Sequence, residues 1–358
     1  MHQDLYCREC LALNGISEFD SIDKIASLYN EINEYDKNNI LIENLCFSGG
    51  GVKTFSYIGG LEILQEYGLL NNIKRIASAS AGSIIALLVA FKYNTNEMKE
   101  MLYKPHNDFL DRSSWSFSNM ISIFKGNYGL HSGNIISLRM KELVNAGFDK
   151  SFPDFRKEKA KEKNTDTYDP TFNDLYEKFG VEIVFSATNL TRERVEYLCP
   201  RNHPDMPLYI GARISMSYPL IYEYVTYNNC AYTDSICSFP ICLFSDNSDT
   251  NLLSSEPNMF DKTLGFYNHF PINENSENPS KNGFISYIYS IIQASQTYIE
   301  SADIRVINKS HDFDDHTISA FIKHLKLFDL DCQIDKLQDC ATLYKIKTLL
   351  WMKKKLQK

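Results

Sequence analysis

The sequence predicts an α/β protein of three layers, in which helices cover both faces of a mostly parallel central sheet. Two units of strand, loop and helix follow one another, with strands over residues 40–47 and 73–77 and helices over residues 54–67 and 81–91. Such alternation requires crossover connections, and these make neighbouring strands parallel. Further strands are expected over residues 181–187, 230–233 and 304–307.

Helical extensions are expected on both sides of the α/β domain. Apolar residues recur at steps of three and four over residues 16–38, which indicates amphipathic helices. The tail from Ile318 onward also has a helical pattern and ends in a basic amphipathic segment around Lys353. We therefore divide the chain into an N-terminal helical extension (residues 1–38), an α/β domain (residues 39–310) and a C-terminal helical extension (residues 311–358).

Three polar segments are expected to be solvated loops. Residues 156–163 form a run of mixed charge, and residues 244–257 and 271–283 are rich in Asn, Ser, Asp and Pro. Compositions of this kind favour loops over binding elements.

The composition excludes several classes of protein. A chain of 358 residues, 44% of them hydrophobic, is long enough to bury a sizeable core without metals or disulfides. The formal net charge of −8 repels a phosphate backbone, so no nucleic acid partner is expected. Neither a signal peptide nor a membrane-spanning stretch is recognisable in the sequence. We therefore expect a soluble, cytoplasmic protein.

The cysteines predict neither a disulfide framework nor a metal site. Their number, nine, is odd and their spacing irregular, which is typical of reduced thiols. Cys7 and Cys10 form the one C-x-x-C pair, and the nearest further ligands, Cys199 and His203, are distant in sequence. Since a structural zinc site needs four ligands at suitable spacing, we expect no metal and no cofactor.

Ser80 is the candidate nucleophile. It lies between a predicted strand and an apolar helix, in a Ser78-x-Ser80-x-Gly82 sequence that matches G-x-S-x-G except at its first position. The small neighbours Ala79 and Ala81 suit a sharp, strained turn that exposes a serine hydroxyl. The alternative is that Ser80 only caps the helix, because serine is a frequent helix cap.

A glycine loop precedes the other early helix. Residues 48–53 contain Gly49, Gly50 and Gly51, but Val52 stands where a P-loop has the glycine before its lysine. Backbone N–H groups at the start of a helix bind anions, and an acyl-transfer oxyanion is one such anion. Because both loops follow parallel strands, we expect them to meet at the same edge of the sheet.

The glycine loop and the following residues 57–61 resemble the oxyanion segment of patatin-like phospholipases, and Ser80 then falls on the nucleophile position of that family. The resemblance spans roughly residues 41–240, and residues 263–266 extend it. Further blocks in family order are residues 128–133, 171–176, 187–190 and 213–219.

The resemblance implies a patatin-like fold and a Ser-Asp dyad that needs no metal or cofactor. The position of the family's aspartate is occupied by Asp234, where Ser235 and Ile236 replace the two glycines of the D-G-G sequence and Ser238 replaces an asparagine. Lys53 occupies a basic position of the family. It is either a solvated loop residue or a residue that fixes the oxyanion loop or contacts an anionic head group.

Three hypotheses follow for the function. In the first, a lipid acyl hydrolase of phospholipase A or lysophospholipase type uses Ser80 as nucleophile, Asp234 as base and the amides of Gly50 and Gly51 as oxyanion donors. In the second, the fold binds lipid or acts as an effector without effective catalysis. A hydrogen bond of about 2.6 to 3.2 Å between Ser80 and Asp234 favours the first, and a gap of about 4 to 5 Å favours the second. The third hypothesis is a Ser-Asp-His triad with one of His269, His311, His316 and His324.

The expected partners are a phospholipid or another lipid ester, a membrane surface and an activating protein. Aromatic and apolar residues cluster over residues 115–124, where they either pack in the core or contact a membrane. The basic segment around Lys353 would attract an anionic membrane weakly.

Overall fold

The computed structural model describes residues 21–110, 128–245, 253, 256–269, 284–309, 311–322, 325, 328, 330 and 334–358. Over these residues the main sheet has eight strands in the order β10-β9-β1-β2-β4-β8-β7, and β5 pairs with β4 beside this path. The strands are β1 (Asn44–Phe47), β2 (Arg75–Ser78), β4 (Glu182–Asn189), β5 (Arg194–Leu198), β7 (Val225–Tyr227), β8 (Cys230–Asp234), β9 (Thr263–His269) and β10 (Thr317–Phe321). A second, small sheet pairs β3 (Gly129–His131) with β6 (Leu220–Tyr222).

The sheet is mostly parallel, as the sequence predicts. The central run β10-β9-β1-β2-β4 is parallel throughout, whereas β5, β7 and β8 join by antiparallel pairing. In β1, for example, Leu45 and Phe47 point into one hydrophobic cluster and Cys46 into another. Because successive side chains of a strand point to opposite faces, two clusters mean that both faces of the sheet are covered.

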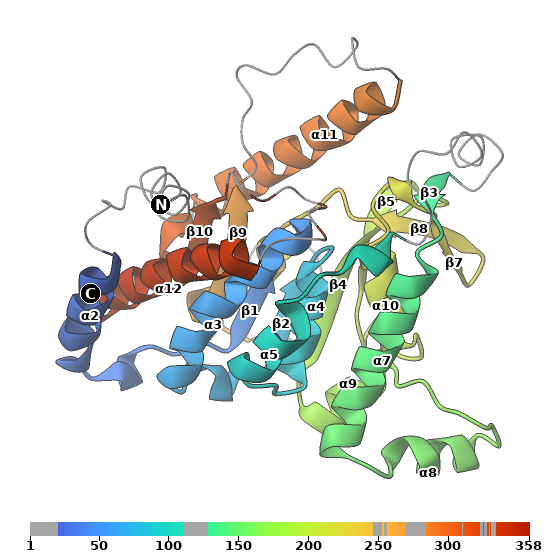
Figure 1. Ribbon diagram of the computed structural model, residues 1–358, viewed down its shortest axis with the longest axis horizontal. Helices are drawn as coiled ribbons and strands as arrows, with labels where there is room; N and C mark the ends of the chain where they lie inside the picture. The colour runs from blue at the N-terminus through green and yellow to red at the C-terminus, as the bar shows by residue number, and fades with distance from the viewer. Residues whose placement is uncertain are drawn as a thin grey trace.

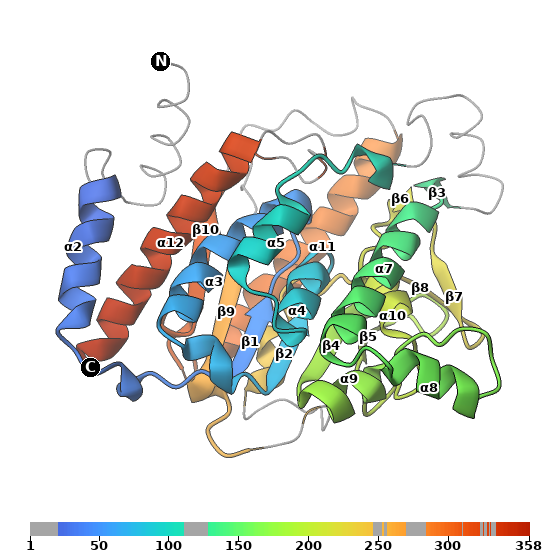
Figure 2. The ribbon, with the colours of Figure 1, turned by 60° about the horizontal axis from the view of Figure 1, so that its bottom comes forward.

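Helices form the two outer layers (Figures 1 and 2). Figure 2 shows α12, α3, α5, α4 and α7 in front of the sheet, while α11 passes behind it. On the face covered by α11, Ile304 and Ile307 of this helix pack in the hydrophobic cluster that contains Cys46. The helices are α2 (Ser21–Asn33), α3 (Tyr57–Glu66), α4 (Gly82–Ala90), α5 (Thr95–Leu102), α7 (Asn134–Ser151), α8 (Phe155–Glu162), α9 (Phe172–Phe179), α10 (Leu208–Ser215), α11 (Phe284–Ile307) and α12 (Ile334–Leu356).

Two local predictions about the later part of the chain are wrong. Residues 304–307 are not a strand but the last turn of α11, because an apolar run of four residues does not distinguish a strand from a buried helix segment. The helical tail expected from Ile318 begins with strand β10, and α12 starts only at Ile334. Strand β10 pairs in parallel with β9, so the segment from residue 311 contributes to the sheet. The division at residues 38 and 310 stays a prediction.

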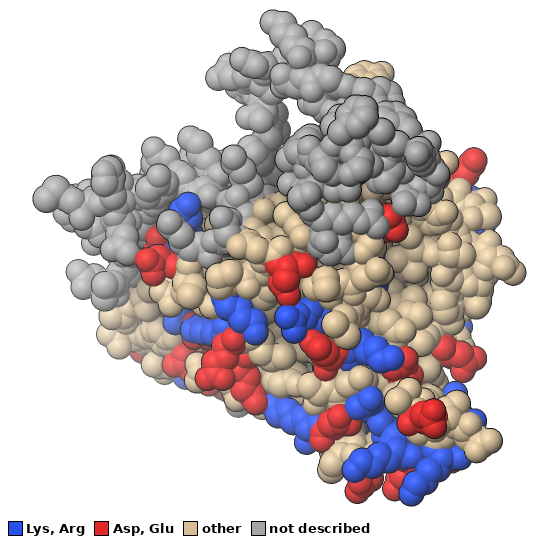
Figure 3. Space-filling view, turned by 45° about the vertical axis from the view of Figure 1, so that its right-hand side comes forward, with Lys and Arg blue, Asp and Glu red and all other residues tan. Residues whose placement is uncertain are grey.

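The mixed-charge run is also not a loop, because it forms helix α8. Its lysines, glutamates and single arginine have high helix propensity, and Phe155 and Ala160 anchor one side of the helix in the core. Figure 3 shows basic and acidic side chains interspersed on this part of the surface, and three ion pairs account for part of that pattern: Arg156 with Asp149, Lys157 with Asp154, and Lys159 with Glu162. Of the other polar segments, residues 246–252, 254, 255 and 271–283 lie outside the described residues, as does the aromatic segment 115–124.

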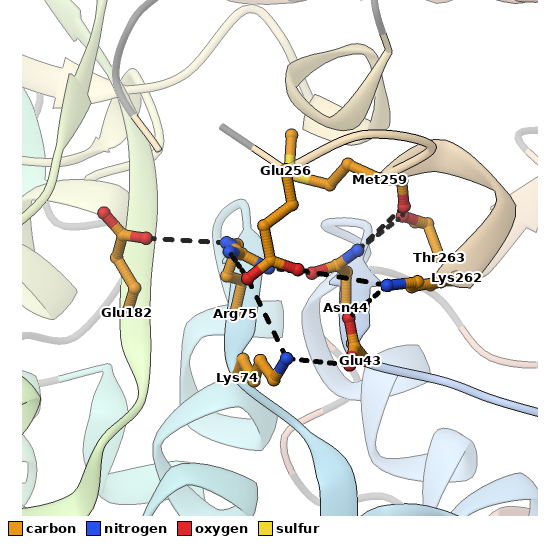
Figure 4. Close-up of polar contacts among 9 residues, drawn as sticks. All are labelled: Glu43, Asn44, Lys74, Arg75, Glu182, Glu256, Met259, Lys262 and Thr263. Atoms are coloured by element: carbon orange, nitrogen blue, oxygen red, sulfur yellow. Dashed lines mark hydrogen bonds and ion pairs between the residues drawn. The ribbon is translucent and has the colours of Figure 1, made fainter. Parts of the chain in front are cut away.

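The amino ends of the central strands are closed by a network of charged residues (Figure 4). Buried Arg75, 3% exposed, donates to Glu256 at 2.9 Å and to Asn44 at 3.2 Å, and its Nε lies 3.7 Å from Glu182. Three acids balance three bases: Glu43, Glu182 and Glu256 with Lys74, Arg75 and Lys262. This leaves the carboxyl ends of the strands as the edge at which an open α/β sheet binds its ligands.

Helix α12 packs directly on α3, the helix that follows the glycine loop. A Cβ on Gly59 would lie 1.8 Å from the Ala341 carbonyl oxygen, and a Cβ on Gly60 would lie 2.4 Å from the Phe266 ring. These two glycines therefore let α3 approach both α12 and the sheet closely. The position of the glycine loop depends on this packing.

Candidate active site

Ser80 lies on a strained turn between β2 and α4. Its φ of 50° is in the left-handed region, which non-glycine residues seldom adopt. The turn is tight because a Cβ on Gly82 would lie 2.7 Å from the Ser48 carbonyl oxygen and 2.8 Å from that of Phe47. This is the geometry of a nucleophile elbow, in which a strained backbone presents the serine hydroxyl above the sheet.

Hydrogen bonds hold the backbone of this turn. The Ser80 amide donates to Ser215 Oγ at 2.9 Å, and Ser215 Oγ in turn donates to the Ser186 carbonyl at 3.0 Å. Ser83 Oγ donates to the Ser80 carbonyl at 2.6 Å. In the sequence Ser215 is visible only as part of the family block 213–219, with no local signal for its contact with the turn.

Asp234 ends strand β8 and faces the serine. Its Oδ2 accepts a hydrogen bond from Ser80 Oγ at 2.6 Å, and its Oδ1 accepts one from the Ser235 amide at 2.7 Å. The carboxyl is 3% exposed, and burial raises its pKa to about 7 although both hydrogen bonds lower it. A pKa near neutrality suits a general base, because proton acceptance and later proton return both remain accessible.

Side-chain hydrogen bonds hold the turn after Asp234, where the two glycines of the family are absent. The Cys237 amide donates to Ser235 Oγ at 3.0 Å, and the Ile236 amide donates to Thr188 Oγ1 at 3.1 Å. A serine hydroxyl that accepts from an amide two residues later is a known way to stabilise a turn. The backbone at residues 235 and 236 has no positive φ, so this turn does not require glycine there.

The glycine loop lies beside the serine. Gly50 has a φ of 148° and Gly51 a φ of 56°, values that favour glycine. A Cβ on Gly49 would lie 3.1 Å from Ser80 Cβ, which places the loop against the nucleophile. The Gly49 amide donates to the Ser238 carbonyl at 2.8 Å, so Gly50 and Gly51 are the loop's candidate donors to an oxyanion.

A buried polar network supports the loop from behind. Ser48 Oγ lies 2.7 Å from the Tyr57 hydroxyl, and Asn268 Nδ2 donates to that hydroxyl at 2.7 Å. The Tyr344 hydroxyl donates to Asn268 Oδ1 at 2.9 Å and to the Tyr267 carbonyl at 2.7 Å. Asn268 and Tyr344 come from β9 and α12, so sequence reasoning centred on the early motifs does not find them.

Lys53 is buried and does not face solvent. Its ammonium group donates to the Ile322 carbonyl at 3.0 Å, just beyond strand β10. This contact ties the segment after the glycines to the edge of the sheet. Of the roles considered for Lys53, the geometry favours fixing the loop over contacting a head group.

The histidines give no support to a Ser-His-Asp triad. Ser80 Oγ donates directly to Asp234, without an intervening imidazole. His311 and His316 lie near the amino ends of β9 and β10, the edge opposite Ser80, and the ring of His269 packs against Tyr267. His324 lies outside the described residues.

One group of metal-ligand side chains occurs among the described residues, away from Ser80. The ligand atoms of Asp261, His311 and His316 all lie within 4.8 Å of one another, with Asp261 exposed. Burial, followed by the positive charge of Lys355, lowers the pKa of His316 to about 4. The positive charge of Lys355 would also repel a bound cation, so we assign no metal to this group.

Ser80 separates two cavities of different character. The first, about 50 Å³, is lined mostly by apolar residues, and the second, about 20 Å³ and called the polar cavity below, is lined mostly by polar residues and glycines. Phe55, Ile84 and Phe109 line both the apolar cavity and a larger one of about 580 Å³ behind it. The polar cavity is lined by Gly49, Gly50, Ser80, Tyr218, Asp234, Ser235, Ser238, Gln293 and Gln296.

An α/β fold with a serine on a strained strand-to-helix turn, a buried carboxylate at 2.6 Å and a glycine loop beside them has the parts of a serine acyl-transfer site. The model of the patatin-like phospholipase family matches residues 45–241, more than half of the chain, and the chain belongs to this family. Both Ser80 and Asp234 lie inside the matched region.

The similar proteins include two viral relatives and a solved structure with the same fold. The chain is 28% identical over 288 residues to the uncharacterized protein R571 of Acanthamoeba polyphaga mimivirus, a match that covers 75% of this chain and 84% of that protein. It is 21% identical over 308 residues to the probable lipid hydrolase 463L of Invertebrate iridescent virus 6, covering 80% and 85%. Among solved structures, VipD from Legionella pneumophila has the same fold, with a TM-score of 0.52 at 15% identity, covering 87% of this chain and 66% of that one.

Proposed function

We propose that the protein is a serine lipid acyl hydrolase that cleaves carboxylic esters of membrane lipids through an acyl-enzyme on Ser80. The observation that carries the proposal is the hydrogen bond of 2.6 Å from Ser80 Oγ to the buried Asp234 carboxylate. Membership of the patatin-like phospholipase family and similarity to a probable lipid hydrolase support the same class of substrate.

The chemistry needs only groups that this chain supplies. Asp234 takes the proton of Ser80 as Oγ attacks the ester carbonyl carbon, and the amides of Gly50 and Gly51 donate to the oxyanion that forms. As the tetrahedral intermediate collapses, Asp234 returns the proton to the departing alcohol oxygen, which leaves an acyl-enzyme. Asp234 then takes a proton from water, the water oxygen attacks the acyl carbon, and the proton returns to Ser80 as the carboxylic acid departs.

The apolar cavities on one side of Ser80 suit the acyl chain. The smaller one touches the nucleophile, and the larger one continues from it behind Phe55, Ile84 and Phe109. An ester with a long aliphatic acyl group would bury that chain there, with the carbonyl left at the serine.

The alternative of a catalytically weak lipid-binding or effector protein requires that Ser80 and Asp234 do not act together as nucleophile and base. At 2.6 Å the Ser80–Asp234 contact lies within hydrogen-bond range, and the hydrogen bonds of Ser235 preserve the turn after Asp234. Both observations favour the active enzyme over the alternative.

Labelling with a fluorophosphonate probe tests the proposal directly. We expect the wild-type protein to form a covalent adduct on Ser80, located by peptide mass spectrometry, and Ser80→Ala to form none. A folded wild-type protein that does not react, under conditions where another serine hydrolase does, would favour the lipid-binding alternative.

Contact with a membrane surface, location in the cytoplasm and activation by a protein partner stay proposals. Within the described part of the chain, no helix has the length and apolar character needed to cross a bilayer. The basic C-terminal segment is less available than its sequence indicates, because Lys353 pairs with Glu31 at 2.5 Å and Lys354 with Asp315 at 2.5 Å. A membrane contact must therefore depend mainly on other residues.

A further inference from the structure

The polar cavity beside Ser80 contains a buried hydroxyl without a partner. Ser238 is 5% exposed, and its Oγ has no hydrogen-bond partner among the described residues. Its backbone is fixed, because its carbonyl accepts the Gly49 amide at 2.8 Å. A Cβ on Gly49 would lie 3.1 Å from Ser80 Cβ and 3.9 Å from Ser238 Cβ, so the two serines flank this glycine. Buried polar groups normally have partners, and a lone hydroxyl in a reactive cavity points to a ligand group.

Helix α11 supplies the opposite wall of the cavity. Gln293 Nε2 donates to the Tyr218 hydroxyl at 2.8 Å and to Gln296 Oε1 at 3.2 Å. Gln296 is 6% exposed and donates to the Ser235 carbonyl at 3.2 Å, next to the catalytic carboxylate. The two amides are neutral groups that both donate and accept hydrogen bonds, a character that matches an alcohol hydroxyl.

The size of the cavity limits what it can hold. Its volume of about 20 Å³ only slightly exceeds the about 10–15 Å³ that one water molecule needs. A single hydroxyl group fits this space, whereas a second acyl chain or a phosphate group does not.

The two cavities also orient the ester. With the acyl chain on the apolar side of Ser80, the alcohol half of the substrate lies at the mouth of the polar cavity and only one hydroxyl enters it. A free hydroxyl on the carbon adjacent to the one that bears the ester oxygen would then reach Ser238 and Gln293.

We propose that Ser238 and Gln293, with Gln296 holding the cavity wall, form a subsite for a free hydroxyl adjacent to the scissile ester. This inference rests on the proposed function and narrows its substrates to monoacyl glycerol lipids, which carry such a hydroxyl. Lysophospholipids and monoacylglycerols share this chemistry, and diacyl lipids lack it at the neighbouring carbon.

The test compares esters that differ only at this hydroxyl. Turnover of palmitoyl lysophosphatidylcholine is measured against its 2-O-methyl analogue, and monoacylglycerol with the same acyl chain identifies which source of the hydroxyl is preferred. We expect kcat/KM of the wild-type protein to be about tenfold higher for the substrate with the free hydroxyl, the effect of about one hydrogen bond in a buried site. In Ser238→Ala and Gln293→Met this ratio is expected to fall toward one.

The ratio within each variant separates recognition from a general loss of activity. Ser295→Ala is the matched control on α11, because Ser295 is exposed and its hydroxyl donates to the Ile291 carbonyl of the same helix. We expect it to keep the wild-type ratio.

Three outcomes contradict the subsite. A wild-type ratio near one means that the cavity holds only a structural water, and an unchanged ratio in both variants assigns discrimination to other residues. A wild-type protein that hydrolyses no ester, p-nitrophenyl butyrate included, refutes the proposed function and the subsite with it. If p-nitrophenyl butyrate is hydrolysed without discrimination among the lipids, the subsite alone fails.

Discussion

The two edges of the central sheet use buried carboxylates in opposite ways. At the amino ends of the strands, hydrogen bonds from Lys74 and Lys262 lower the pKa of Glu43, so that this carboxylate stays charged. At the carboxyl ends, Asp234 has a hydroxyl and an amide as its hydrogen-bond partners, and burial raises its pKa to about 7. The pairing of each buried acid, more than its burial, therefore sets the direction of its pKa shift: down for the ion-paired Glu43, and up into the range of a general base for Asp234.

Ser80→Ala should have the largest effect on activity and leave the charged edge untouched. It removes the proposed nucleophile, so turnover of p-nitrophenyl esters is expected to fall by about a thousandfold or more. The variant should fold, because only one hydroxyl is lost and the remaining turn has its own hydrogen bonds. Circular dichroism and turnover are measured on the same sample, and full activity would remove Ser80 from the mechanism.

Gly50→Val tests the glycine loop at the same edge. A Cβ there would lie 3.0 Å from Asn268 Nδ2, and the φ of 148° suits glycine alone. Loss of an oxyanion donor typically costs about a hundredfold to a thousandfold in kcat, and we expect a decrease of that size.

A matched control isolates the cost of backbone strain. Gly180→Val also places a valine at a positive φ, here 68°, but nothing lies within 4 Å of the Cβ that it adds. We expect Gly180→Val to lose some thermal stability and keep its activity. A Gly50→Val protein that is unstable rather than folded and inactive would show that the glycine serves packing, and a stable, fully active one would end the oxyanion role.

The pKa of Asp234 predicts the pH dependence of the reaction. The base must be ionised, so kcat/KM should rise with pH to a plateau above about pH 7 and be about a hundredfold lower at pH 5 than on the plateau. The profile is measured with a neutral p-nitrophenyl ester, whose own protonation does not change in this range. A profile that is flat down to pH 5 would contradict Asp234 as the titrating base.

Asp234 and Glu43 should change the free energy of unfolding in opposite directions as the pH rises. Asp234 has a higher pKa folded than unfolded, so between about pH 4 and pH 7 the folded state binds more protons and stability falls as pH rises. Asp234→Asn should therefore raise the free energy of unfolding at pH 8 by about 1 kcal/mol or more. Glu43 has a lowered pKa, so its contribution is present above its unfolded pKa and is lost as pH falls through the folded value.

Urea unfolding at pH 8 measures the free energy of unfolding of one variant from each edge. Glu43→Gln should lower the free energy of unfolding where Asp234→Asn raises it, because it leaves Lys74 and Lys262 without their shared partner. If both substitutions changed the free energy of unfolding in the same direction, the contrast between the two edges would be wrong.

The sequence predicts the elements near the motifs better than those far from them. Strands β1, β2, β4 and β8 lie within or overlap the expected ranges, because each combines an apolar run with a loop that punctuates it. The spacing of Ser78, Ser80 and Gly82 is local, so the turn that presents Ser80 is visible in the sequence. The hydrogen bond to Asp234 depends on the register of β8 against β4, which no local pattern reports.

The supporting residues of the site are less predictable for a physical reason. Ser238, Asn268 and Gln293 acquire their roles from packing between segments distant in the sequence. Each is an ordinary polar residue in its local context. The same holds for Ser235, whose hydroxyl accepts from the Cys237 amide in the turn after Asp234.

Tyr344→Phe is the mildest change and tests how far the carboxyl edge extends into the fold. The hydroxyl of Tyr344 donates to Asn268 Oδ1 at 2.9 Å, and Asn268 Nδ2 donates to Tyr57, which lies 2.7 Å from Ser48 Oγ at the start of the glycine loop. Removing this hydroxyl frees Asn268 to turn and loosens the loop, so we expect kcat to fall about threefold to tenfold, as for one net hydrogen bond, with little change in KM. A purely structural role would instead lower the melting temperature at constant kcat. Thr348→Val, one turn further along α12, is the control, because its hydroxyl donates only to the Tyr344 carbonyl of the same helix. A kcat loss in Thr348→Val equal to that in Tyr344→Phe would assign the effect to the packing of α12 and not to the polar network.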